Sequence, residues 1–378
     1  MGGGEIALLN LVKNLDLALV TPVILLFSKG PLASRLREAG FETHILSLSP
    51  NVLDTRKDSL GLATLLRVSI AFRVLLHIFQ VARFTHQHQI DLVHTNSLKS
   101  DIIGGLAGRL AHRRVIWHIR DRIDSDYLPK SVVRAFRILA RWIPNNIIAI
   151  SQATLKTLQL PADFKHARVI YDGTPLIALT DRHPGARSNP LIGLVGRISP
   201  WKGQHIFLRA AAQVRQRFPN ARFQIIGSAL FSEQQYESQV RALASELNLT
   251  DAVEFTGFRT DVPALIQNLD ILVHASTLGE PFGQVVIEGM AAAKPVIATR
   301  GGGIPEIVID GETGILIPMN DAPAMADAIS ELLSDNRRRN ELGSRGRRRT
   351  QEHFTIERTA RTIELFYKSC AASNKSGS

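Results

Sequence analysis

The alternation of short apolar runs with helical patterns constrains the fold of this chain more than any other feature. From residue 22 onward, runs rich in Val, Ile and Leu end in polar residues or Gly, and amphipathic stretches separate them. Strands that alternate with helices predict parallel sheets, so the sequence predicts an α/β protein. The expected strands are VILLF, FETHILSL, DLVHTN, RVIWHI, NIIAIS and ARVIYDG, followed by LIGLVG, RFQIIGS, VEFTGF, DILVHAS, PVIAT and TGILIP.

The stretch ALTDRHPGARSNP (178–190) interrupts this periodicity with the residues typical of a linker. We place a domain boundary there, which gives a first domain over residues 1–183 and a second over 184–353. A last helical run and a polar tail fill residues 354–378. Both domains are predicted to be doubly wound, and ligands of such sheets lie outside the carboxyl ends of the strands.

Composition excludes several classes of protein. The chain has 378 residues and a single cysteine, Cys370, so it has no intramolecular disulfide framework, and a reducing cytoplasm fits best. Its Cys and His residues do not show the spacing of a zinc site. Arg67 and Arg73 interrupt the most apolar segment, which argues against a transmembrane span.

Positive charge is concentrated in the first half. The first 185 residues carry 23 Lys and Arg against 14 Asp and Glu, whereas the rest carries 22 against 20. Such a bias attracts phosphates, nucleic acid or anionic lipid, although a solvated Arg-rich surface explains it equally well. The basic, apolar segment Leu60 to Phe84 predicts peripheral contact with an anionic membrane.

Two stretches of the second half carry the strongest chemical signals. In GLVGRISPWKG, Arg197 and Lys202 follow an apolar strand, where cations can bind phosphate. In GEPFGQVVIEGM, a helix that starts near Gly283 offers free N–H groups to an anion, with Glu280 before it and Glu288 one turn inside. Carboxylates so placed can accept hydrogen bonds from vicinal hydroxyls, or they can merely complement the helix dipole.

Other motifs are weaker alone. The glycines of the GGGE start allow close approach of a phosphate or sugar, but a frayed terminus explains them equally well. WHIRD places His118 at a strand end, where a structural His is the commoner case. The pair Asp124 and Asp126 in DSD is expected about once by chance among the Asp residues of this chain, and we give it no metal role.

The order of these motifs is more informative than any one of them. GG-x-E is followed by H-x-R-D, GR-x4-KG, E-x7-E, GG-x-PE and DG-x-TG. This order resembles that of the family 4 glycosyltransferases, which have the GT-B fold of two Rossmann-like domains facing each other across a cleft. The resemblance covers nearly the whole chain.

The resemblance implies retaining transfer of a hexose from a nucleotide-sugar donor, without an essential metal or other cofactor. It assigns diphosphate binding to two cations, donor-sugar and ribose contacts to the E-x7-E segment, and a position beside the reacting sugar to one histidine. The implied catalytic residues are Arg197, Lys202, Glu280 and His118. The implied donor-binding residues are Gly3, Gly4, Gly227, Phe258, Phe282, Gly283, Gln284, Val285 and Glu288, and the acceptor side is assigned to Asn96 and Asp101.

The chain departs from the family pattern in three places. Members usually have a strand before GG-x-E, whereas Met1 directly precedes the motif here, so we expect the first domain to lack its first strand through truncation or a misassigned start. Asp172 replaces a common Asn in YDGTP. Gly289 replaces a usual Ala, which costs up to about 1 kcal/mol within a helix. The resemblance also implies that the last helix returns to the first domain.

We therefore expect a cytoplasmic glycosyltransferase, at the inner face of the membrane, that uses a UDP-sugar and a polysaccharide or lipid-linked saccharide acceptor, as in exopolysaccharide biosynthesis. Two alternatives remain open. One is a sugar-nucleotide epimerase, and the other is a non-catalytic basic scaffold on membrane or nucleic acid. We do not expect nucleic acid as a partner, because no aromatic pattern typical of RNA binding accompanies the basic residues.

Overall fold

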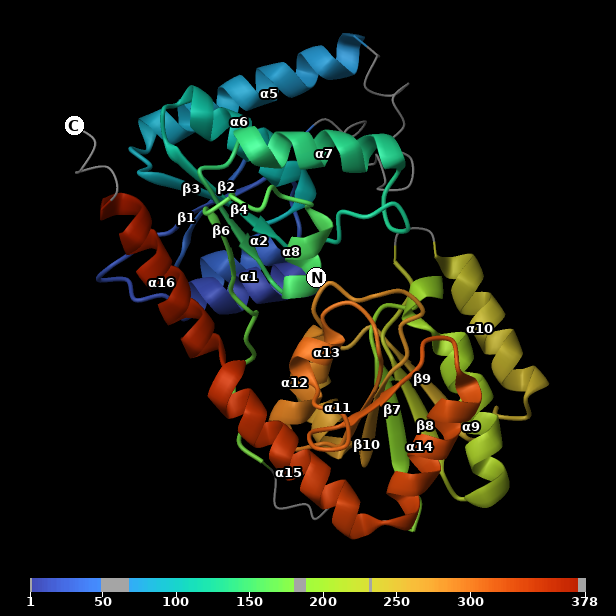
Figure 1. Ribbon diagram of the computed structural model, residues 1–378. Helices are drawn as coiled ribbons and strands as arrows, with labels where there is room; N and C mark the ends of the chain where they lie inside the picture. The colour runs from blue at the N-terminus through green and yellow to red at the C-terminus, as the bar shows by residue number, and fades with distance from the viewer. Residues whose placement is uncertain (1, 49–67, 180–187, 231–232, 373–378) are drawn as a thin grey trace. The chain divides into compact units, whose positions relative to one another are not determined.

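The computed structural model describes residues 2–48, 68–179, 188–230 and 233–372 (Figure 1). It forms two compact units: unit 1 comprises Met1–Asp172 and Ile356–Ser378, and unit 2 comprises Gly173–Thr355. The boundary predicted between residues 183 and 184 lies outside the described residues. The segment after Asp172 already belongs to unit 2, because Thr174 N–H donates to the Phe354 carbonyl and the carbonyls of Ile177 and Ala178 accept from side chains of that unit.

Unit 1 alternates helices and parallel strands, as its apolar periodicity predicts. Its elements are α1 (Gly3–Lys13), β1 (Val23–Leu26), α2 (Pro31–Glu38), β2 (Glu42–Ile45), α5 (Val68–Gln87), β3 (Leu92–Thr95), α6 (Leu98–Leu110), β4 (Arg114–Ile119), α7 (Lys130–Trp142), β5 (Asn146–Ala149), α8 (Gln152–Thr157), β6 (Ala167–Val169) and α16 (Ile356–Ala372).

The strands of unit 1 form two separate sheets. β1 pairs with β2, and a four-stranded sheet has the order β3-β4-β5-β6, with every pair parallel. Among the described residues, no strand pairs with the second edge of β1 or of β3. Both of these strands are mostly half-buried, whereas β4 is almost fully buried.

Helices cover both faces of the larger sheet (Figure 1). Alternate residues of a strand point to opposite faces, so Val115 and Trp117 of β4 pack with α6 and α7 while Ile116 packs with α1 and α16. α16 thus lies in the core of unit 1 although it is the last helix that the structure describes, and Asp16 N–H donates to the Glu364 carboxylate at 2.7 Å. Helix α1 also packs on β1 through a separate cluster that includes Leu9 and Val12.

Unit 2 is built on a single sheet. Its elements are β7 (Leu191–Val195), the 3-10 turn η2 (Pro200–Lys202), α9 (Gln204–Arg217), β8 (Arg222–Ile226), α10 (Gln234–Glu246), β9 (Val253–Gly257), α11 (Val262–Asn268), β10 (Ile271–His274), α12 (Gln284–Ala291), β11 (Val296–Thr299), α13 (Ile304–Ile307), β12 (Ile315–Ile317), α14 (Ala322–Ser334) and α15 (Asn336–His353).

The six strands of this sheet are parallel and have the order β12-β11-β10-β7-β8-β9. The chain runs outward from β7 to β9, returns to the other side of β7 and runs outward again from β10 to β12. The strand order therefore reverses between β7 and β10. Ligands of doubly wound sheets bind outside the carboxyl ends of the strands at this switch point.

Candidate active site

A cluster of hydrogen-bonded side chains marks the switch point of unit 2. The Glu280 carboxylate is 6% exposed. Its Oε1 accepts hydrogen bonds from the Lys202 ammonium, from Ser276 Oγ at 2.8 Å and from His274 Nε2 at 3.1 Å. Thr299 donates to the Ser276 carbonyl and lies 3.3 Å from His274 Nδ1. The predicted site residues Lys202 and Glu280 therefore lie together, Lys202 after β7 and Glu280 after β10.

Electrostatics keep this carboxylate ionised. Burial alone would raise the pKa of Glu280, but the positive charge of Lys202 and the hydrogen bond from His274 outweigh burial and lower that pKa below its usual range. The backbone beside Lys202 is fixed by Gly203, which has a φ of 71°. A Cβ at this glycine would lie 1.9 Å from the Ala275 carbonyl oxygen, so only glycine fits.

The start of α12 lies immediately after Glu280 in the chain. Gly283 is its N-cap, with a φ of 129°, and a Cβ there would lie 2.5 Å from Ile304. The first N–H groups of the helix, at Gln284 and Val285, have no acceptor within the helix. Burial raises the pKa of the Glu288 carboxyl to about 7, although a hydrogen bond with Gln284 opposes the shift.

Arg197 follows β7 and has a different partner from Lys202. Its Nε lies 3.2 Å from the Glu233 carboxylate, just before α10. The two cations that the sequence assigned to one diphosphate are thus each paired with a separate acid. A ligand phosphate would have to share or replace these partners.

The remaining predicted donor residues of unit 2 lie at its other strand ends or in its core. Gly227 follows β8 with a φ of 140°, and a Cβ there would lie 2.1 Å from the Gly196 carbonyl oxygen. Packing within the protein therefore requires a glycine at this position, with or without a bound ligand. Phe258 follows β9 and is exposed. Phe282 is buried and packs edge-on against Phe354.

Unit 1 has its own polar cluster at the carboxyl ends of β3 and β4. Arg120 donates from Nε to Asn96 Oδ1 at 2.6 Å and forms an ion pair with Asp172. Asn96 Nδ2 lies 3.4 Å from the Gly4 carbonyl oxygen, so the start of α1 joins the cluster. Gly3, the first residue of α1, faces open space, where a Cβ would meet no atom within 4 Å.

Two predicted residues of unit 1, Asp101 and His118, are buried. Asp101 is 1% exposed and accepts a hydrogen bond from Thr95. Burial raises the pKa of Asp101 well above its usual range, against that hydrogen bond. His118 is fully buried, and burial together with the charge of Arg120 lowers its pKa.

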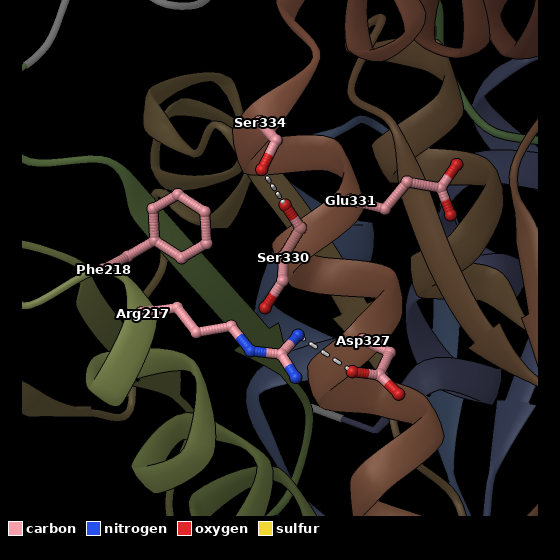
Figure 2. Close-up of a pocket in the computed structure, with 6 residues that line it drawn as sticks. All are labelled: Arg217, Phe218, Asp327, Ser330, Glu331 and Ser334. Atoms are coloured by element: carbon pink, nitrogen blue, oxygen red, sulfur yellow. Dashed lines mark hydrogen bonds and ion pairs between the residues drawn. The ribbon is translucent and has the colours of Figure 1, made fainter.

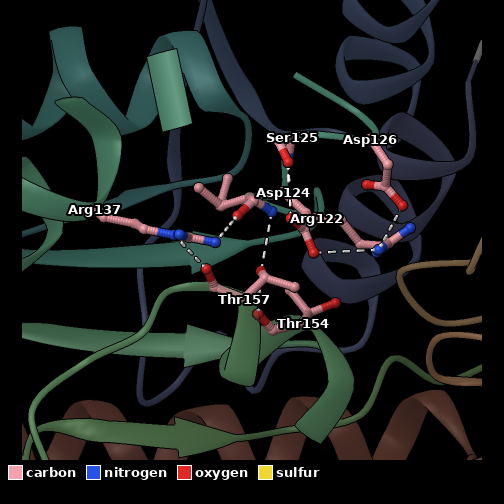
Figure 3. Close-up of polar contacts among 8 residues, drawn as sticks. Arg122, Asp124, Ser125, Asp126, Arg137, Thr154 and Thr157 are labelled. Carbon is pink, nitrogen blue, oxygen red and sulfur yellow. Dashed lines mark hydrogen bonds and ion pairs between the residues drawn. The ribbon is translucent and has the colours of Figure 1, made fainter. Parts of the chain in front are cut away.

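Both aspartates of the DSD stretch form ion pairs with an arginine. Arg122 Nη2 lies 3.5 Å from Asp124 and 3.0 Å from Asp126 (Figure 3). In the same view Arg137 donates to the carbonyl of Thr157. Arg137 also donates to the Ile123 carbonyl, and Ile123 N–H donates to Thr157 Oγ1, so the loop after β4 is held against α7 and α8.

Two further features lie apart from the predicted residues. A hollow between α9 and α14 contains an ion pair of Arg217 with Asp327 at 3.0 Å, both largely exposed (Figure 2). One group of described residues could hold a metal ion: Glu42, His44 and His88 lie with their ligand atoms within 4.8 Å of one another. No residue of either feature belongs to the set that the sequence assigned to catalysis or binding.

Sequence reasoning missed several residues of both clusters. His274 and Ser276 end the strand DILVHAS, and two polar residues at the carboxyl end of a strand were a usable signal. Asp172 was noted as a departure, but its ion pair with Arg120 could not be read from sequence, since 52 residues separate them.

Family models match both halves of the chain. Residues 31–176 match the model described as glycosyltransferase family 4, and residues 180–349 match the glycosyl transferases group 1 model. With its two α/β units and parallel sheets, the chain is a glycosyltransferase of the GT-B fold. Within that class it belongs to glycosyltransferase family 4, as its motif order implied.

Proteins similar to this chain include two named glycosyltransferases and a protein whose structure was solved with UDP and glucose. A D-inositol 3-phosphate glycosyltransferase of Corynebacterium urealyticum is 29% identical over 316 residues, which are 76% of this chain and 74% of that protein. The lipopolysaccharide core mannosyltransferase LpsB of Rhizobium meliloti is 29% identical over 59% of this chain and 65% of its own length. The structure of Anabaena Alr3699/HepE with UDP and glucose has a TM-score of 0.84 at 27% identity and covers 97% of this chain and 96% of that chain.

Within the described ranges, every helix is too short or too polar to cross a bilayer.

Proposed function

We propose that the chain is a retaining, metal-independent hexosyltransferase that uses a UDP-sugar and a polysaccharide or lipid-linked saccharide acceptor. The observation that carries the proposal is the cluster at the switch point of unit 2. There Lys202 and the first N–H groups of α12 flank the buried Glu280. This is a place where a diphosphate and a hydroxylated sugar can bind next to each other.

The charges of this cluster suit the chemistry of transfer. Cleavage of the anomeric bond leaves negative charge on the departing diphosphate, and preorganised donors stabilise that charge more in the transition state than in the ground state. Glu280 occupies one of the three ammonium donors of Lys202, so two others can serve a phosphate. The first N–H groups of α12 add the positive end of a helix dipole.

Retention of configuration fits the state of Glu280. A carboxylate that accepts three hydrogen bonds and has a lowered pKa is a weak nucleophile. This disfavours a double displacement through Glu280 and favours attack on the sugar from the side that the diphosphate leaves. UDP is our choice of nucleotide because the 27%-identical HepE protein binds UDP and glucose.

Thermal unfolding with UDP, GDP, ADP and their sugar conjugates, with and without EDTA, tests the proposal. A ligand at 100 times its dissociation constant adds about 2.7 kcal/mol of stability. We expect a shift with UDP that EDTA does not change and that Glu288→Ala and Arg197→Ala abolish. Arg217→Ala is the matched control, because it removes an exposed arginine that pairs with an acid in the same unit.

The alternatives give different results. Conversion of a nucleotide sugar into its epimer in the absence of any acceptor would establish an epimerase. A folded protein that responds to no nucleotide but binds lipid or RNA in a salt-dependent manner would be a scaffold. Either result overturns the transferase proposal.

We also propose that unit 1 contacts an anionic membrane from the cytoplasmic side. Residues 60–67 of the predicted segment lie outside the described residues, but α5 continues it. Phe72, Leu75, Leu76 and Phe79 form one stripe of this helix and are 49–66% exposed. The described length of α5 contains arginines and no acid. An apolar stripe on a basic helix is the pattern of an interfacial helix.

Sedimentation with liposomes measures this contact. We expect binding to vesicles rich in phosphatidylglycerol at low salt, and loss of binding in Phe72→Ser/Phe79→Ser. Leu365→Ser is the control, since it removes an equally exposed apolar residue from α16 on the other face of the sheet. Equal binding by the wild-type protein, the double variant and Leu365→Ser would refute the proposal.

A further inference from the structure

Three side chains form a hydrogen-bonded chain that ends at the predicted catalytic histidine of unit 1. The Tyr367 hydroxyl of α16 makes a short hydrogen bond to His94 Nδ1. His94 Nε2 lies 3.0 Å from His118 Nδ1. The other ring nitrogen of His118, Nε2, is buried and has no hydrogen-bond partner among the described residues.

Both histidines are neutral in this position. Burial lowers the pKa of His94 to about 3 and lowers that of His118 far below its usual range, with the charge of Arg120 acting in the same direction. A neutral imidazole has one N–H and one acceptor nitrogen. Each hydrogen bond in the chain therefore fixes the position of the proton in the next ring.

The direction of the chain follows from the tyrosine. Among the described residues, His94 is the one hydrogen-bond partner of the Tyr367 hydroxyl, and burial raises the pKa of Tyr367 beyond its usual range. A phenol that keeps its proton donates it to the nearest acceptor, so O–H points at His94 Nδ1. His94 then has its proton on Nε2 and donates to His118 Nδ1. His118 must carry its proton on Nε2.

We propose that Tyr367 acts through His94 as a positioning residue that holds His118 in the tautomer protonated at Nε2. His118 then offers a hydrogen-bond donor to an oxygen atom, and it cannot act as a base through that nitrogen. A buried N–H without an acceptor is costly, so an oxygen atom of a bound ligand or water completes the chain. The part of this inference that concerns the ligand rests on the proposed transferase function.

The tautomer can be measured without any substrate. In protein labelled with ¹⁵N-histidine, we expect Nε2 of His118 to show the chemical shift of a protonated nitrogen, and Nδ1 that of an acceptor nitrogen. Tyr367→Phe removes the donor and should mix the two tautomers of His118. His94→Gln keeps a side-chain acceptor for the Tyr367 hydroxyl and a donor for His118 Nδ1, so it should retain the wild-type tautomer of His118. His94→Leu has neither group and should lose it. An unprotonated Nε2 in the wild-type protein would overturn the proposal.

Activity gives the second readout. We expect Tyr367→Phe to lower kcat about tenfold, the size expected for one neutral hydrogen bond, while UDP still shifts the melting temperature through unit 2. The matched control is Tyr236→Phe, since Tyr236 makes the same type of bond to His205 Nδ1 at 2.8 Å. An unchanged kcat in Tyr367→Phe with a changed tautomer refutes the role of the chain in catalysis. Absence of any UDP shift in the wild-type protein refutes the proposed function and leaves the tautomer result standing.

Discussion

The ion pair of Lys202 with Glu280 yields the sharpest prediction of stability. Lys202→Met removes the cation but keeps the aliphatic side chain, and it leaves a carboxylate that is 6% exposed. Removal of one partner of a buried ion pair typically costs about 3 to 5 kcal/mol. Ser276 and His274 still donate to Glu280 in this variant. We therefore expect a loss of stability at the lower end of that range, about 3 kcal/mol at pH 7.

The dependence on pH distinguishes this cause from lost packing. In the wild-type protein the pKa of Glu280 is depressed, so its contribution to stability is present above the unfolded pKa of about 4.3 and is lost as pH falls through the folded pKa. Without Lys202, burial raises the pKa of Glu280, and the carboxyl can take up a proton at pH 4. The difference in stability between the two proteins should therefore shrink from pH 7 to pH 4.

Hydrogen exchange measured by mass spectrometry can follow the β10 and α12 amides of unit 2 and convert their protection into a free energy of opening. A double-mutant cycle with Glu280→Gln should give a coupling energy of about 1 to 3 kcal/mol at pH 7. A coupling energy near zero would show that the ion pair does not stabilise the site. The same conclusion would follow if Lys202→Met lost the same free energy of unfolding at pH 7 and at pH 4.

Three shorter predictions concern other residues. Because the pKa of Glu288 is raised to about 7, UDP affinity should rise as pH increases through 7, and Glu288→Gln should flatten this profile in calorimetric titrations. Asp172→Ala should destabilise unit 1 by about 3 kcal/mol in urea unfolding, since it leaves Arg120 buried without its acid, and Asp172→Asn should cost less. Gly203→Ala should abolish UDP-induced thermal shifts, because its Cβ would overlap the Ala275 carbonyl; a variant with a wild-type shift would contradict this.

Local signals were enough to predict the strands and the positions of the motifs. Apolar runs such as LIGLVG and DILVHAS became β7 and β10, and GEPFGQVVIEGM became a loop followed by α12, with Gly283 as its cap. These features depend on residues close together in the chain, which is why periodicity and cap residues reveal them.

Partners of buried groups could not be predicted in the same way. Lys202 and Glu280 are 78 residues apart, and His94 and Tyr367 are 273 apart. Tertiary packing brings these pairs together, and a single sequence contains no record of it. The same limit applies to Asp101: the family resemblance assigned it to the acceptor side, but its burial and its hydrogen bond from Thr95 could not be predicted from the sequence.

The discontinuity of unit 1 has a consequence for the order of folding. Unit 2 is contiguous in sequence, whereas the core of unit 1 needs Leu11 and Leu15 from the beginning of the chain and Ile363 and Phe366 from its end. Domains usually fold during synthesis from the N-terminus onward. Here the second unit can fold on the ribosome before the first, because the first unit cannot complete its core until α16 has been synthesised. Since Tyr367 arrives with that helix, a nascent chain can fold its predicted nucleotide site before His118 has its tautomer set.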